Sequence, residues 1–236
     1  MTEAAINLRQ SPDQYIEIPF NIKREAVLEN FKQERTRAKV ETIVDEIIEM
    51  AAKVAKPKGI YRVACVSARD GDGVEIDGVR FNSRVLARNL GETSTVIPEI
   101  VTCGHEVDEI DIPPTEYIKY YTLNVVKQVI MSEATAYFFP YLRDKFGLTD
   151  MVHLHPGEFE DFPISAQPLI FQLFNDVEGS IGVRLTSTYT LQPMKSATGL
   201  LFSSEFNFES CELCLQAHCA ARRKAYNPRL VKQFLE

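Results

Sequence analysis

The chain has 236 residues, of which 45% are hydrophobic and 25% charged, and its formal net charge is −7. These values are typical of a globular protein with one sizeable core. A net negative charge repels phosphates and anionic headgroups, so we expect neither nucleic acid nor a membrane as partner. No stretch approaches the roughly 18 apolar residues of a membrane span, and the polar N-terminus lacks a signal-peptide pattern. We therefore expect a cytoplasmic protein with reduced cysteines.

The N-terminal half begins with an extended lead-in and then alternates between helix and strand patterns. Residues 24–55 carry an apolar stripe at helical spacing, which predicts one helix whose charged first half is solvated or meets a partner. Turn signals and β-type residues then predict strands over 59–66, 74–79 and 94–103, with a turn at 70–73 and a helix over 83–90 capped by Asn82-Ser83. Pro98 favours an edge or bulge position for its strand.

The C-terminal half begins with a long helix from about Glu116, capped by Thr115 and ending near Gly147, with Pro140 as a kink or an end. Its many tyrosines are interpreted as core residues. Further along, the patterns predict a loop over 151–163, a helix over 165–174, strands between 180 and 202, and a last helix starting at Asn227-Pro228. This order of elements predicts an α+β fold.

Three of the five cysteines lie within nine residues, as Cys211-x2-Cys214-x4-Cys219. A C-x2-C pair grips one metal centre in many zinc and iron–sulfur sites, and the third thiolate lies near enough to join it. We therefore predict an iron–sulfur cluster or a zinc ion bound by these three cysteines. His218, Cys65, Cys103, His153 or His155 could supply the fourth ligand. The alternative is a set of reduced thiols that binds nothing.

Two blocks of sequence resemble a known family. Residues 182–186 and 191–199 read as a strand, a P-x-x-S-x-S/T-G turn and a second strand, and residues 153–158 occupy the place of an R-x-x-x-G-Y signature. Over roughly residues 40–203 the chain resembles the reactivation domain of cobalamin-dependent methionine synthase. The resemblance implies a curved, mostly antiparallel sheet with long helices, and binding of S-adenosylmethionine. It also implies docking over the cobalamin of a methionine synthase or another corrinoid protein.

The resemblance also implies which residues bind the ligand: His153, His155, Pro156, Gly157, Glu158, Pro193, Lys195, Ser196 and Gly199. Two of them depart from the signature, since His153 replaces its arginine and Glu158 its tyrosine. An arginine pairs bidentately with a carboxylate, whereas a neutral histidine offers one donor and a glutamate repels the carboxylate. S-adenosylmethionine binding is therefore in doubt for this chain.

We divide the chain into an extended lead-in (1–22), an α+β domain (23–203) and a cysteine-rich segment (204–236). Because no cobalamin-binding Asp-x-His-x-x-Gly stretch is present, we interpret it as a stand-alone form of the domain. We expect an accessory component for the reductive reactivation and methylation of methionine synthase, with cobalamin supplied by the partner. The alternative is a metal-binding or electron-transfer protein of corrinoid metabolism that does not bind S-adenosylmethionine.

Overall fold

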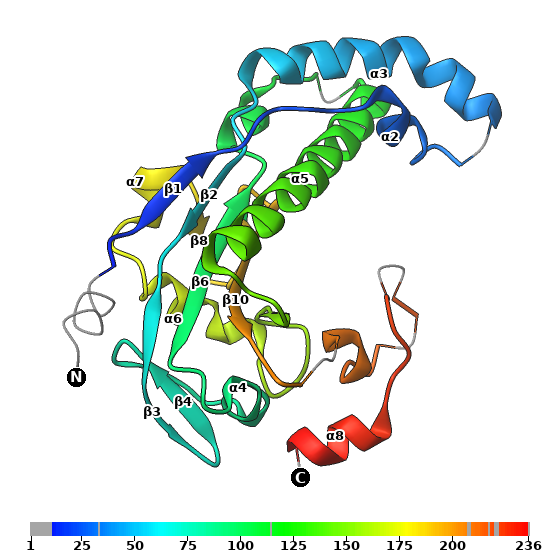
Figure 1. Cartoon of the computed structure of the whole chain (residues 1–236). Helices are drawn as coiled ribbons and strands as arrows, with labels where there is room; N and C mark the ends of the chain where they lie inside the picture. The colour runs from blue at the N-terminus through cyan, green and yellow to red at the C-terminus, as the bar shows by residue number, and fades with distance from the viewer. Residues whose placement is uncertain are drawn as a thin grey trace.

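The computed structural model describes residues 11–32, 34–113, 115–206, 209–216, 218–219 and 222–235. Its centre is an eight-stranded sheet in which every pairing is antiparallel. The strand order is β1-β2-β6-β3-β4-β5, and β10 pairs with β6 and with β7 (Figure 1). The strands are β1 (Gln14–Glu17), β2 (Lys58–Tyr61), β3 (Ala64–Asp70), β4 (Gly73–Ile76), β5 (Val79–Phe81), β6 (Thr95–Thr102), β7 (Met151–Leu154) and β10 (Ser196–Ser203). A separate two-stranded sheet joins β8 (Arg184–Leu185) to β9 (Leu191–Gln192).

Helices cover the sheet and bury two apolar clusters. The first cluster contains Val44, Val126, Phe138 and Leu201, and it belongs to α2 (Arg24–Leu28), α3 (Glu34–Val54), α5 (Tyr117–Phe146) and the sheet. The second contains Leu86, Ile170, Ile181 and Phe234, from α4 (Arg84–Leu90), α6 (Gln167–Phe171), α7 (Val177–Ile181) and α8 (Pro228–Leu235). Short 3-10 helices lie at His105–Glu109 (η1), Ile164–Ala166 (η2) and Ser210–Glu212 (η3). The predicted α+β fold class is confirmed.

Pro98, predicted at an edge or a bulge, lies inside the sheet and not at its edge, opposite an interruption between two neighbouring strands. It pairs with Leu200 of β10, on the side of β6 opposite β2 and β3. Proline has no N–H to offer a neighbouring strand. The strand predicted over 59–66 accordingly breaks between β2 and β3, at Arg62 and Val63, and the Pro98 carbonyl accepts one hydrogen bond there from Arg62 N (3.3 Å).

Several helix boundaries differ from the prediction. The single helix over 24–55 is instead α2 and α3, because the chain turns at 29–32 to bury Val27, Leu28 and Phe31. The long helix α5 runs through Pro140 and ends at Gly147, as predicted, with a left-handed backbone (φ 63°). Its tyrosines, predicted as core, are largely exposed, at 43–78% for Tyr117, Tyr120, Tyr121 and Tyr137. A long helix on the face of a sheet buries one side only.

In the C-terminal half, two segments have a different secondary structure from the one predicted. Residues 151–154, predicted as loop, form β7, and Ile181, predicted in a strand, ends α7 at a left-handed Gly182 (φ 72°). The turn at 70–73 and the last helix, which begins at Pro228, are confirmed. In the part of the chain that the structure describes, no helix combines the length and apolar character required to cross a bilayer.

Candidate functional site

The two blocks that carry the family resemblance meet on strands β7 and β10. His153 in β7 pairs with Leu201 in β10, and an ideal Cβ at Gly199 would lie 2.3 Å from His153 Nε2. The next histidine, His155, places Nδ1 2.8 Å from the carbonyl oxygen of Thr198. The imidazole centroids of the two histidines are 3.8 Å apart. The structure therefore brings His153, His155 and Gly199 together, while their role in binding stays a prediction.

Glu99 completes this group, and the sequence analysis missed it. It sits on the central strand β6, paired with Gly199, and its carboxylate Oε1 is 2.8 Å from His153 Nε2. Its side chain is fully buried, and its second oxygen has no hydrogen-bond partner among the described residues. A lone acidic residue inside the apolar run TVIPEIVT was the available signal. Buried charges are rare unless they are paired or bind a metal.

Burial dominates the electrostatics of this group. It raises the pKa of Glu99 to about 8 and lowers the pKa of His153 to about 4, because a charged form is poorly solvated there. Burial, followed by repulsion from His153, also lowers the pKa of His155. Near pH 7 both imidazoles are therefore neutral, and Nδ1 of His155 must carry the hydrogen that it donates to the Thr198 carbonyl.

The loop after the histidines turns at Gly157 and leads into a cavity of about 550 Å³. Gly157 has φ 93°, a conformation that favours glycine, and its N–H donates to Phe162 O at 2.7 Å. Glu158 is held on both oxygens, since it accepts from His155 N (3.1 Å) and from Ser210 Oγ (2.9 Å). Gly157, Glu158 and Cys214 all line this cavity, so the predicted loop and the cysteine segment face each other. Pro156 is buried beside it.

The cysteine segment is folded around Arg222. Its guanidinium donates at 2.8–3.0 Å to four backbone carbonyls, those of Cys211, Cys214, Gln216 and Lys224. Arg223 N donates to Cys211 Sγ at 3.5 Å, and this contact chiefly lowers the pKa of the Cys211 thiol. Cys103, one suggested fourth ligand, is instead buried in the first cluster, and burial raises its pKa to about 12.

The three thiols of Cys211, Cys214 and Cys219 are not drawn together as a ready metal site. Within the described ranges, Glu99, His153 and His155 form the group whose ligand-type atoms lie within 4.8 Å of one another. Metal binding by the cysteines therefore stays a prediction.

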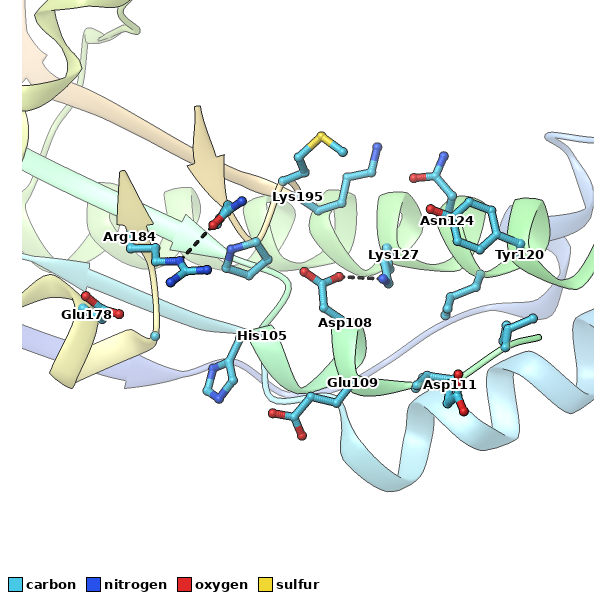
Figure 2. A pocket seen from close by; sticks show the side chains of 17 residues that line it. His105, Asp108, Glu109, Asp111, Tyr120, Asn124, Lys127, Glu178, Arg184 and Lys195 are labelled. Atoms are coloured by element: carbon cyan, nitrogen blue, oxygen red, sulfur yellow. Dashed lines mark hydrogen bonds and ion pairs between the residues drawn. The ribbon is translucent and has the colours of Figure 1, made fainter. Parts of the chain in front are cut away.

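The remaining predicted residues lie at the start of β10, near a second cavity of about 860 Å³. Pro193 and Lys195 line this cavity together with residues of η1, α5 and α7 (Figure 2). Ser196 faces inward instead, with Oγ 2.7 Å from Pro193 O and 2.8 Å from Thr102 Oγ1. In the wall of this cavity, Lys127 Nζ and Asp108 Oδ1 form an ion pair at 2.5 Å. Pro193 and Lys195 thus border a different cavity from Gly157 and Glu158.

The comparisons identify a fold but no family. No protein-family model matches the sequence, and no curated protein matches it. Among solved structures, the chain is similar to the MetH reactivation domain bound to AdoHcy, with a TM-score of 0.59 and 15% sequence identity. That likeness covers 100% of this chain and 97% of the other. The chain has the fold of a MetH reactivation domain.

The side chains at the two altered signature positions do not fit a ligand carboxylate. His153 Nε2 is engaged with Glu99, and its side chain is only 14% exposed. Both oxygens of Glu158 already accept hydrogen bonds, and a second carboxylate would be repelled there. What remains of the predicted ligand contact is the turn at Gly157 and the cavity beside it, whose volume lies in the range of small-molecule sites.

Proposed function

We propose that this chain acts as a reactivation module for a cobalamin-dependent methionine synthase or another corrinoid protein in the cytoplasm. The similarity of its fold, over its whole length, to the MetH reactivation domain carries the proposal. The turn at Pro156-Gly157, which matches the family signature, supports the binding of a ligand of the S-adenosylmethionine class in the adjoining cavity. Pro193 and Lys195, which border the larger cavity, are proposed to contact the partner or the ligand from the other end of β10.

Ligand binding is tested by calorimetry with S-adenosylmethionine and S-adenosylhomocysteine. We expect binding by the natural chain and at least about tenfold weaker binding by Gly157→Ala, because a Cβ there meets Ile164 Cδ1 at 3.2 Å in a left-handed backbone. Gly78→Ala is the matched control, since Gly78 has φ 83° and an added Cβ meets nothing within 4 Å. No heat of binding, with or without a corrinoid partner, contradicts the ligand part of the proposal.

The partner is tested separately. The chain is added to a cob(II)alamin-containing methionine synthase that lacks its own reactivation domain, together with an electron donor and S-adenosylmethionine. We expect methylcobalamin to form, followed by its visible absorbance, only when this chain is present. An anaerobic pull-down scored for corrinoid proteins identifies the natural partner, and failure in both assays contradicts the proposed role.

The second candidate is a metal-binding or electron-transfer protein that uses Cys211, Cys214 and Cys219. The observation that favours it is the hydrogen bond from Arg223 N to Cys211 Sγ, since hydrogen bonds to cysteine sulfurs tune iron–sulfur clusters. Anaerobic purification distinguishes an iron–sulfur cluster from a structural zinc ion. A brown protein with thiolate-to-iron absorption, bleached in Cys214→Ser, indicates an iron–sulfur cluster, whereas a colourless protein with one zinc lost in Cys214→Ser indicates a structural metal.

A further inference from the structure

A second set of metal-ligand side chains, which includes no cysteine, lies on the face of the sheet that α5 covers. Glu99 and His153 belong to strands on either side of β10, and they reach toward each other across Gly199. An ideal Cβ at Gly199 would lie 2.3 Å from His153 Nε2 and 2.7 Å from Glu99 Oε1. The absent side chain therefore creates the space in which the two groups meet. Phe139 of α5 packs edge-on against the His153 ring, with centroids 4.4 Å apart, and limits its movement.

His155 is oriented as a metal ligand is. Its Nδ1 donates to the Thr198 carbonyl at 2.8 Å, which leaves the lone pair of a neutral ring on Nε2. A histidine that binds a metal through one nitrogen commonly donates the other N–H to a backbone carbonyl or a carboxylate. His155 as a whole residue is partly exposed, whereas Glu99 is fully buried.

Glu99 supplies an independent sign that something is missing from the group. Its side chain is completely buried, and Oε2 has no hydrogen-bond partner among the described residues. Arginine and lysine do not contact it within the described chain; its one polar contact there is His153. A buried polar oxygen without a hydrogen-bond partner is unfavourable in either protonation state of the carboxyl group. A bound cation would satisfy the free oxygen.

We propose that Glu99, His153 and His155 bind one divalent metal ion of the zinc class. Their ligand atoms already lie within 4.8 Å of one another, so a small closure would bring them around one ion. Two neutral imidazoles and one carboxylate are a common ligand set for Zn²⁺, and a fourth position stays open for water or a substrate atom. The site uses none of the cysteines and does not depend on the proposed function.

The test uses the full chain in which Cys211, Cys214 and Cys219 are all replaced by serine, so that thiolates of the cysteine segment cannot contribute. The protein is freed of metal with a chelator and titrated with Co²⁺ and then Zn²⁺. We expect one Co²⁺ to bind with visible d–d bands of a four- or five-coordinate nitrogen and oxygen site, without thiolate charge-transfer absorption. One Zn²⁺ should displace it and raise the melting temperature.

Two variants in this background assign the ligands. His155→Gln and Glu99→Gln are each expected to weaken Zn²⁺ binding by about 100-fold or more, since even second-sphere changes cost about 10- to 100-fold. His105→Gln, at a half-exposed histidine on the other cavity, is the matched control and should bind as before. Circular dichroism of each metal-free protein verifies folding. If Glu99→Gln unfolds, the Zn²⁺ affinity of His155→Gln alone tests the proposed site.

The proposal is overturned if the thiol-free protein binds no Co²⁺ or Zn²⁺ while folded. It is equally overturned if His155→Gln binds as well as its parent. In either case Glu99 and His153 form a buried hydrogen-bonded pair and nothing more.

Discussion

At the scale of single residues, two glycines in the sheet leave space that neighbouring side chains occupy. Gly59 leaves room for the Phe138 ring of α5, because an added Cβ would come within 2.6 Å of it. Gly199 leaves room for the contact between His153 and Glu99 in the same way. These positions follow from three-dimensional packing between strands and a helix that are distant in sequence. A glycine in a strand pattern signals only that something approaches closely.

Gly199→Ala is therefore expected to destabilise the fold by roughly 1–3 kcal/mol, the usual cost of overpacking a core. The new Cβ would push His153 away from Glu99 and leave the buried carboxyl without its one polar contact. The free energy of unfolding is measured with urea. Gly71→Ala, at a turn where an added Cβ meets nothing within 4 Å, is the control and should change it by less than about 0.5 kcal/mol. Equal effects of the two substitutions would contradict this packing.

A second residue-scale prediction concerns Asp70 at the β3–β4 turn. Its carboxylate accepts from Arg80 (2.8 Å) and from the N–H groups of Asp72 and Gly73 (2.9 Å each), and these bonds, led by Arg80, lower its pKa to about 2. Because the pKa is lower in the folded state, the stabilisation is complete above the ordinary value of 3.8 and is lost as the pH falls through about 2.

The carboxyl carbon shift of Asp70 in an NMR titration measures this pKa directly. Arg80→Gln should move the midpoint upward toward the ordinary value, whereas Arg69→Gln, on the same hairpin but bonded to the Thr93 carbonyl, should leave it in place. An unchanged midpoint in Arg80→Gln would contradict the assigned cause.

At the scale of elements, local signals predicted some helix ends, but Thr115 does not cap α5, whose N-cap is Glu116 without a side-chain hydrogen bond. Ser83, Gly147 and Pro228 act where the sequence placed them, because caps depend on hydrogen bonds within a few residues. The place of Pro98 in the interior of the sheet depends on which strands become its neighbours, and no local pattern contains that. Glu99 is marked locally as a lone acid in an apolar run, but its partners come from β7 and β10, which no local pattern predicts.

Ser83 gives an element-scale prediction. Its hydroxyl accepts from Leu86 N at 3.0 Å as the N-cap of α4 and donates to Asp161 Oδ2 at 2.5 Å, in a side chain that is nearly fully buried. Ser83→Ala should therefore destabilise the protein by about 1–2 kcal/mol in urea unfolding. Ser132→Ala, exposed on α5 and bonded only to the carbonyl of Gln128 among the described residues, should cost less than about 0.5 kcal/mol. A similar small cost at both serines would exclude a capping role.

At the scale of the whole molecule, the cysteine-rich segment is attached to the α+β body rather than separate from it. Leu213 and Phe234 are buried in the second cluster, and Ser210 donates to Glu158 on the loop after β7. Figure 1 shows α8 beside α4 at the end of the sheet that carries the β3–β4 hairpin. The division at residue 203 therefore marks a change of composition, and its independence as a folding unit stays a prediction.

Phe234 is the anchor through which that prediction can be tested. It is 1% exposed and packs edge-on against Phe206, with ring centroids 5.3 Å apart. Removing a buried phenylalanine costs about 3–5 kcal/mol, so Phe234→Ala should let residues 204–236 detach from the body more than tenfold more often. Limited proteolysis should then cut within this segment at least about tenfold faster, while the sheet amides keep their hydrogen-exchange protection. Leu215→Ala, at a side chain that is 73% exposed, should leave both measurements unchanged. Loss of protection throughout the sheet in Phe234→Ala would instead mean that the segment and the body unfold as one cooperative unit, which would exclude a boundary at residue 203.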